Sequence, residues 1–140
     1  MYTELFSEVH EVLADYQPLL VTAGTMYPVV AWAGGRFHRL VFIAHVGQVV
    51  GDLDMRLVQF NPHTYVTKVV PGKVAPRITN DSSRFVLFEL RCEEIDVAHG
   101  FTDVGLEIVV SNTAMFSAIA LGIVPRYAPV WPNHLDVVIV

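Results

Sequence analysis

Charge is scarce in this sequence. Only 16% of its 140 residues are Asp, Glu, Lys or Arg, against roughly 25% in ordinary soluble domains, while 53% are hydrophobic. So few charged side chains cannot form a fully polar surface, so we expect partners to cover some of the apolar surface of the chain. The nine Lys and Arg residues are scattered singly and the formal net charge is −5, which argues against nucleic acid as a partner.

Long hydrophobic runs are absent as well. No stretch reaches the ~18 uninterrupted apolar residues that a membrane-spanning helix needs. The first residues, Met1-Tyr2-Thr3-Glu4, are acidic where a secretory signal is basic, and no apolar signal core follows them. We therefore predict no membrane association, and synthesis in a cytoplasm.

Cysteine and metal-ligand spacings are equally sparse. The single cysteine, Cys92, cannot form an internal disulfide, and neighbouring Glu93 and Glu94 disfavour the thiolate that a nucleophile needs. His38 and His45 are an odd number of positions apart, so one strand would place them on opposite faces. The remaining histidines have no close partner either, namely His10, His63, His99 and His134. We predict no metal and no other cofactor.

Catalytic motifs are not found. Five carboxylates gather around one strand end, at Glu89, Glu93, Glu94, Asp96 and Asp103, but their pattern is typical of a solvated connection. The serines lie outside any nucleophile-elbow motif. Gly34-Gly35 is better explained by a hairpin turn than by a phosphate loop. We predict that the chain is not an enzyme.

What the sequence does contain is one helical pattern followed by many short strands. Apolar residues recur at helical spacing over residues 3–17, with Glu4, Glu8, Glu11 and Asp15 on the other face, and Pro18 ends the pattern. Strands are predicted over residues 19–23, 28–33, 38–46, 53–60, 65–70, 84–90, 104–110 and 116–123, separated by turn signals such as Gly51-Asp52, Pro71-Gly72 and Ser111-Asn112.

These elements predict an all-β fold: a jelly-roll-like β-sandwich of about eight antiparallel strands, because no helical crossovers separate the strands. We expect a single domain. Residues 1–17 form an N-terminal amphipathic helix or arm, residues 18–127 the sandwich, and residues 128–140 an extended C-terminal tail.

An ordered set of short signals between about residues 19 and 130 resembles a group of small phage virion proteins. The signals are Ala23-Gly24-Thr25, the apolar strand of residues 39–47, the alternating strand of residues 53–59, the stretches of residues 88–91, 94–96 and 100–101, the strand of residues 104–110, and Ala118-Ile119-Ala120-Leu121-Gly122 leading to Arg126-Tyr127-Ala128-Pro129. By these signals the chain resembles the capsid cement, or decoration, proteins of short-tailed bacteriophages.

The resemblance implies a jelly-roll protein on the outer surface of the virion. Such a protein forms a symmetric oligomer and bridges neighbouring subunits of the major capsid protein, which stabilises the shell against packaged DNA. The helical segment and the tail lie outside the resemblance.

Closed two-fold symmetry is commonest among homo-oligomers, so we expect a homodimer, with a trimer as the alternative. The expected interface, with the second copy or with the capsid, comprises Phe6, Val9, Leu13 and Tyr16 of the helical segment and Val130, Trp131, Leu135 and Val137 of the tail. Two other readings stay open. One is a different phage structural role, in head–tail joining or in the tail; the other is a ligand-binding β-barrel with an apolar internal cavity.

Overall fold

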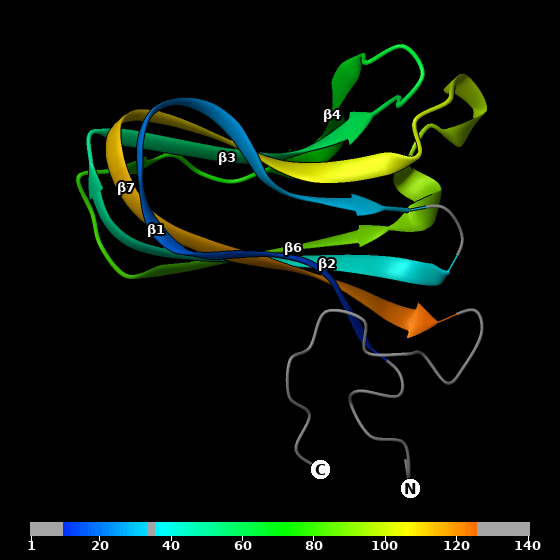
Figure 1. Ribbon diagram of the computed structural model, residues 1–140, viewed down its shortest axis with the longest axis horizontal. Helices are drawn as coiled ribbons and strands as arrows, with labels where there is room; N and C mark the ends of the chain where they lie inside the picture. Colours follow the sequence, from blue (N-terminus) through cyan, green and yellow to red (C-terminus); the bar gives the residue numbers. More distant parts are fainter. Residues whose placement is uncertain (1–9, 34–35, 126–140) are drawn as a thin grey trace, which may run out of the picture.

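The computed structural model describes residues 10–33 and 36–125, which form an antiparallel sheet of seven strands (Figure 1). The strands are β1 (Glu11–Trp32), β2 (Phe37–Val50), β3 (Asp52–Phe60), β4 (Thr67–Val74), β5 (Ile78–Thr79), β6 (Arg84–Arg91) and β7 (Asp103–Pro125). Two 3-10 turns, η1 (Cys92–Glu94) and η2 (Val97–His99), connect β6 to β7. In this part of the chain no helix is long and apolar enough to cross a membrane.

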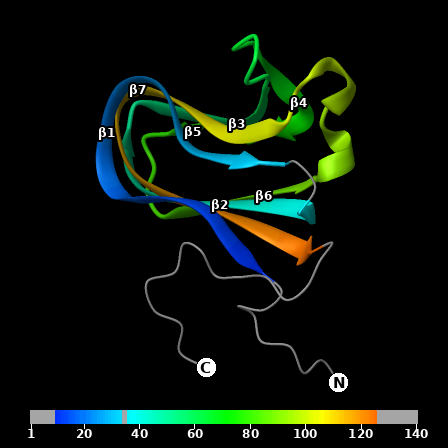
Figure 2. The same ribbon diagram turned by 45° about the vertical axis from the view of Figure 1, so that its right-hand side comes forward.

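The sheet curls into two layers because its longest strands pair with different neighbours along their length. The first part of β7 pairs with β3, and its second part pairs with β2, while β1 runs beside β7 almost throughout. One layer therefore holds β4, β5, β3 and the adjoining parts of β7 and β1, and we call it the β3 layer. The β2 layer holds β6, β2 and the remaining parts of β7 and β1. Figures 1 and 2 show the two layers facing each other.

The curl follows from strand length and from glycine. A straight strand of 23 residues, the length of β7, would extend about 75 Å at about 3.3 Å per residue. Gly51 joins β2 to β3 at φ +83°, where a Cβ atom would lie 2.4 Å from Ser111 Oγ on β7. The same hydroxyl accepts a hydrogen bond from the Asp52 amide at 2.7 Å. Gly24, at φ +143°, lies at a register shift of β1. Only glycine fits these bends without strain.

The core fills the space between the layers. Inward-facing positions alternate along each strand, as with Leu53, Met55 and Leu57 of β3. The largest fully buried side chains of the described residues include Phe42, Phe116, Leu40, Leu90, Leu106 and Ile108. Close packing of such side chains is the main stabilising contribution to a domain of this kind.

The all-β prediction is confirmed, but the predicted N-terminal helix is wrong where the structure describes it. Residues 11–17 are part of β1 and pair with β7, and residues 3–9 lie outside the described range. Register shifts after Val12 and after Tyr16 interrupt strict alternation, and this produces the helix-like spacing of apolar residues. Glu11, expected on the solvent face, is 1% exposed and bonds to Arg36 at 2.5 Å.

Several predicted turns are also wrong. The two strands predicted over residues 19–23 and 28–33 are parts of β1, and those predicted over residues 104–110 and 116–123 are parts of β7. The turn signals between them mark bends inside continuous strands. Pro71-Gly72 lies within β4, and the short strand β5 was not predicted. A glycine or a polar pair therefore indicated a change of direction, but not whether the strand ended there.

Candidate interaction surfaces

The outward side of the β2 layer is apolar. Ladder pairing aligns Leu87 of β6, Ile43 of β2 and Ile119 of β7 in one row across three strands. In the next row Phe85 stacks on His45, with ring centroids 4.1 Å apart and planes 7° from parallel. Phe85 and Leu87 are 74% and 62% exposed. We call this surface the apolar face.

The apolar face continues along β7 onto β1. Leu20 of β1 pairs with Met115 of β7, and both side chains are exposed. Gly47 of β2 makes room for Met115, since a Cβ atom on Gly47 would lie 2.9 Å from the Cβ of Met115. Exposed apolar side chains thus extend from the β6 edge to β1, with no described element covering them.

Charged side chains border the apolar face, and they pair with each other. Arg39 donates to Glu89 at 3.0 Å at one end of the strands, and Arg84 pairs with Asp81 at the other. Asp15 of β1, which pairs in register with Ile119, is the exception, since it forms no ion pair with a described cation. The surface therefore offers a partner mainly apolar area with a polar rim. This is the general anatomy of protein interfaces.

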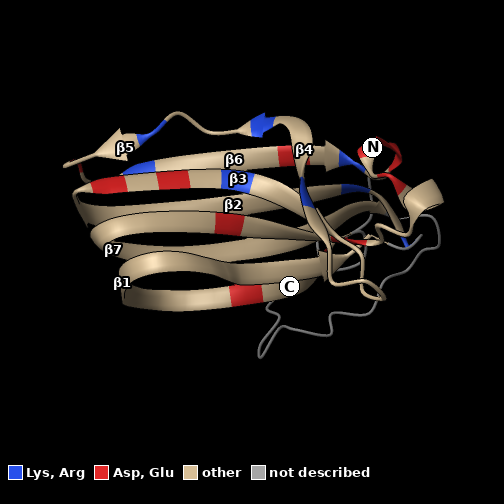
Figure 3. Cartoon of the chain, turned by 90° about the horizontal axis from the view of Figure 1, so that it is seen from above, with Lys and Arg blue, Asp and Glu red and all other residues tan. Residues whose placement is uncertain are grey.

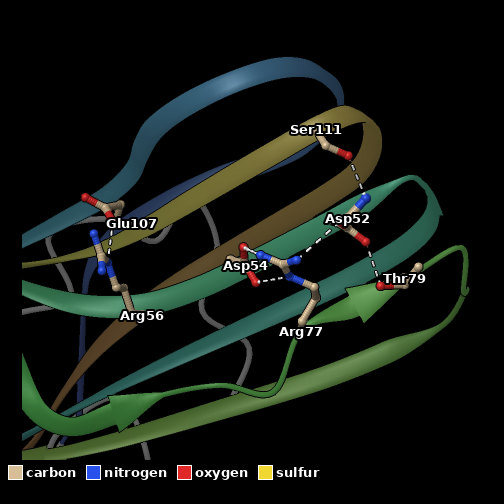
Figure 4. Close-up of polar contacts among 7 residues, drawn as sticks. All are labelled: Asp52, Asp54, Arg56, Arg77, Thr79, Glu107 and Ser111. Carbon is tan, nitrogen blue, oxygen red and sulfur yellow. Dashed lines mark hydrogen bonds and ion pairs between the residues drawn. The ribbon is translucent and has the colours of Figure 1, made fainter.

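The outward side of the β3 layer is organised differently, around charged groups. Figure 3 shows two acidic positions followed by a basic one along β3. Glu107 of β7 is 5% exposed, and its carboxylate pairs with Arg56 Nε at 2.5 Å (Figure 4). The same carboxylate accepts a hydrogen bond from the Tyr27 hydroxyl at 2.9 Å. Burial, and next the hydrogen bond to Glu107, raises the pKa of Tyr27.

A second group of charges ties β5 to β3. Arg77 donates to both carboxylate oxygens of Asp54, at 2.9 and 2.8 Å, and to Asp52 at 3.4 Å (Figure 4). Asp52 also accepts a hydrogen bond from the Thr79 hydroxyl at 2.7 Å. The hydrogen bond from Arg77 is the main reason why the pKa of Asp54 is lowered. These contacts stabilise the two-residue strand β5.

At one end of the β3 layer lies an aromatic groove. Its lining includes Tyr27, Val30, Phe60, Pro62, Tyr65 and Asp103. The rings of Tyr27 and Phe60 meet edge to face, with centroids 5.2 Å apart. Gly105 lets Phe60 lie across β7, because a Cβ atom on Gly105 would be 2.7 Å from the Phe60 ring. The groove therefore depends on a glycine in the middle of a strand.

Hydrogen bonds fix the loop that carries Tyr65. Asn61 Oδ1 accepts from the amides of His63 and Thr64 at 2.9 and 3.2 Å, and Asn61 Nδ2 donates to the His99 carbonyl at 3.1 Å. The Tyr65 amide donates to the Asn61 carbonyl at 2.8 Å. Tyr65 is 88% exposed and adopts a left-handed φ of 58°. The loop thus holds an aromatic side chain in water in a strained conformation, which is common at binding sites.

The carboxylates suspected of acid–base roles are mostly held in ion pairs. Asp96 contacts Lys68 at 2.5 Å and His99 at 2.8 Å, and the hydrogen bond from Lys68, followed by that from His99, lowers its pKa to about 2. Glu89, Glu93 and Glu94 pair with Arg39, Arg91 and Lys73 respectively. Within the described ranges no three His, Cys, Asp or Glu side chains are placed to hold a metal ion.

Of the predicted interface residues, the structure describes Leu13 and Tyr16. Both are half-buried and pack against the core, and the Tyr16 ring lies 6.1 Å from that of Phe116. Phe6, Val9, Val130, Trp131, Leu135 and Val137 lie outside the described residues. Their role stays a prediction.

Sequence reasoning missed the apolar face and the aromatic groove. The pattern of β6 contains a signal for the apolar face, because Phe85 and Leu87 alternate with Val86 and Phe88 and both faces of the strand are therefore apolar. The groove joins residues 27, 60, 65 and 103, and no local pattern in the sequence connects them.

Comparison with known proteins finds similarity in fold only. No protein-family model matches the chain, and no curated protein matches it. T=1 particles derived from infectious bursal virus match with a TM-score of 0.51 and 16% identity over 86% of this chain and 32% of that one. The VP2 subviral particle of infectious bursal disease virus matches with a TM-score of 0.49 and 17% identity, over 86% and 33% of the two chains. Tobacco streak virus coat protein matches with a TM-score of 0.36 and 11% identity, over 97% and 98%.

This chain spans about a third of the length of the bursal virus proteins. At these identities the similarity concerns the fold alone. The chain is an all-antiparallel curled sheet similar to part of a protein that forms viral particles.

Proposed function

We propose that this chain is a virion structural protein: a capsid cement protein that binds the outside of a phage shell. It acts as a symmetric homodimer and joins neighbouring subunits of the major capsid protein. The chain then lies on the outer capsid surface and holds neighbouring capsid subunits together through non-covalent contacts.

The observation that carries this proposal is the apolar face. Phe85 and Leu87 are mostly exposed, they pair in register with His45 and Ile43 of β2, and no described element covers them. Contiguous exposed apolar surface of this kind marks interaction sites in soluble proteins. Burying a side chain such as Phe or Leu contributes about 1.5–3 kcal/mol, so the aligned row of Leu87, Ile43 and Ile119 offers substantial binding free energy.

Repetition over a shell multiplies the effect of each contact. A dimer whose first copy is bound presents its second copy to the next capsid subunit at high effective concentration. Modest affinity per face is then sufficient to stabilise a shell, and no catalytic group is required.

Two further points support a virion role. The fold is similar to part of a protein that forms viral particles, with a TM-score of 0.51. The ordered sequence signals, from Ala23-Gly24-Thr25 to Ala118-Ile119-Ala120-Leu121-Gly122, resemble those of phage cement proteins. The first point concerns fold and the second sequence, so neither depends on the other.

The alternatives are less well supported. A ligand-binding barrel requires an apolar internal cavity, whereas in the described residues large side chains such as Phe42, Phe116 and Leu40 fill the space between the layers. An enzyme requires converging reactive groups, and the candidate carboxylates Glu89, Glu93, Glu94 and Asp96 are instead paired with cations. A head–tail joining or tail role uses the same kind of surface, and copy number separates it from cementing.

The test is occupancy on purified particles of the phage that encodes the chain. Quantitative gels should show near-equal stoichiometry with the major capsid protein, and Phe85→Ser combined with Leu87→Ser should reduce occupancy at least tenfold. Val74→Ser is the matched control, because Val74 is equally exposed but lies on β4 of the β3 layer. A ring-like copy number would indicate a joining role, and unchanged occupancy of the double variant would refute the apolar face as the capsid-binding surface.

A further inference from the structure

The cations of this protein are almost fully paired. The sequence holds nine Lys and Arg residues, and each of those within the described residues forms an ion pair with a carboxylate. The remaining one is Arg126, which lies outside the described residues. Any carboxylate that the described cations leave uncompensated is therefore a candidate partner for Arg126.

Two described carboxylates, Asp15 and Asp103, form no ion pair with any described cation. Asp103 lines the aromatic groove, where its Oδ1 accepts a hydrogen bond from the Thr102 hydroxyl at 3.2 Å. The groove thus combines aromatic rings with one uncompensated negative charge. It is the surface to be expected for a ligand with apolar rings or prolines next to a cation.

The segment after β7 has this chemistry. Residues 126–132 read Arg-Tyr-Ala-Pro-Val-Trp-Pro, which places prolines three and six residues after the arginine. Proline fixes its own φ near −65° and pushes the preceding residue toward extended conformations, so such a segment favours the polyproline II helix. Grooves lined by aromatic side chains recognise this helix in several unrelated domains, at small entropic cost.

We propose that the aromatic groove binds residues 126–132 of a second copy of the chain, with Arg126 paired to Asp103 and the prolines packed on the aromatic side chains. The proposal rests on the proposed function in one respect, since it supplies the contact that makes the homodimer. By two-fold symmetry each copy gives its segment to the groove of the other.

The dimensions allow the arginine and one proline to bind together. Three steps of polyproline II at about 3.1 Å place Pro129 about 9 Å from Arg126. The stretch of β7 from Asp103 to Gly105, over which the Phe60 ring lies, is about 7 Å at about 3.4 Å per residue. With Arg126 at Asp103, Pro129 therefore falls near Phe60, whose ring centroid is 5.2 Å from that of Tyr27.

The connection of the chain favours a second copy over the chain's own segment. β7 ends at Pro125, which pairs with Phe37 in the β2 layer. The groove opens on the outward side of the β3 layer, so the core and both layers of a copy separate its own Pro125 from its groove. The last described residue before the segment thus lies on the opposite side of its own molecule from the groove.

Mixing two full-length variants tests the proposal. One carries Asp103→Lys and Tyr65→Ala, which disable the groove; the other carries Arg126→Glu and Pro129→Ala, which disable the segment. Sedimentation velocity should show that each variant alone has a dimer dissociation constant at least about tenfold above that of the unmodified chain, because aromatic anchors and charge pairs dominate interface energies. The mixture should regain heterodimers through its one intact groove and one intact segment.

Matched controls and opposite outcomes are available. Asp15→Lys makes the same charge change at the other uncompensated carboxylate, on β1 of the β2 layer, and should leave dimerisation unchanged. Heterodimers that fail to form in the mixture, or groove variants that dimerise like the unmodified chain, would overturn the proposal. Particle occupancy is measured separately: a monomer found on shells refutes the groove contact and leaves cementing intact, whereas a dimer absent from shells does the reverse.

Discussion

Strand β7 contributes to the outward sides of both layers, but its outward side chains have different surroundings in the two layers. In the β3 layer, β7 presents Glu107, which is nearly buried by its contacts with Arg56 and Tyr27. In the β2 layer the same strand presents Ile119, in a row with Ile43 and Leu87. The charge of Glu107 is satisfied within the chain, whereas the row of Ile119, Ile43 and Leu87 has no described partner there.

This difference separates groups that stabilise the fold from groups that serve association. Internal ion pairs and hydrogen bonds contribute to the free energy of unfolding of the isolated chain, whatever it binds. Exposed apolar side chains contribute little until a partner removes them from water. The contacts of Glu107 in the β3 layer should therefore respond to mutation in folding assays, and the apolar face of the β2 layer in binding assays.

Among the charged groups, the largest expected effect on folding comes from removing the carboxylate at the centre of the β3 layer. Glu107→Ala leaves the Arg56 guanidinium and the Tyr27 hydroxyl without their acceptor, which should lower the free energy of unfolding by about 2 kcal/mol. The cost stays below that of a fully buried pair because Arg56 is half-exposed. Urea denaturation measures it.

Glu107→Gln serves as the control for this prediction. The amide keeps an acceptor for Tyr27 and loses only the charge opposite Arg56, so we expect a smaller loss than for alanine. An alanine variant as stable as the unmodified chain would show that the Glu107 contacts do not stabilise the β3 layer, and the contrast between the layers would fail.

A smaller effect should appear in acid. The pKa of Asp96 is about 2 in the folded chain, and that of Asp54 is also lowered, whereas an unfolded aspartate titrates near 3.9. Because the folded-state pKa lies below the unfolded one, the contacts with Lys68, His99 and Arg77 stabilise the fold at pH values above about 4. This stabilisation is lost as the pH falls from about 4 to about 2.

Thermal unfolding between pH 6 and pH 2 measures the acid effect, and Asp96→Asn is its control. The asparagine variant should lose less stability across the interval from pH 4 to pH 2 than the unmodified chain does. Equal losses would assign the acid sensitivity to other carboxylates.

The sequence was informative where a strand obeys a simple period. The strand predicted over residues 53–60, where apolar and charged residues alternate, is β3, and the strand predicted over residues 38–46 is part of β2. Antiparallel all-β architecture followed from these patterns and from the absence of helical crossovers.

The sequence was misleading where pairing between distant segments overrides the local preference for a secondary structure. Residues 11–17 have a helical period, yet they pair with residues 118–122 because β7 offers a long open edge. The groove could not be predicted for the same reason: Tyr27, Phe60 and Asp103 become neighbours only through the register of β1, β3 and β7. Exposure of Phe85 likewise depends on whether another element covers β6, which local sequence does not reveal.

The smallest expected effect on folding is the sharpest test of the contrast between layers. Leu87 and Leu90 lie three residues apart on β6, one on the apolar face and the other fully buried in the core. Leu90→Thr should lower the free energy of unfolding by about 2–4 kcal/mol, because it removes buried methyl groups and buries a hydroxyl. Leu87→Thr should change it by less than about 0.5 kcal/mol, because threonine suits an exposed strand position and no packing is lost. If Leu87→Thr were as costly as Leu90→Thr, the apolar face would be an internal packing surface, and its proposed role in binding the capsid would have to be abandoned.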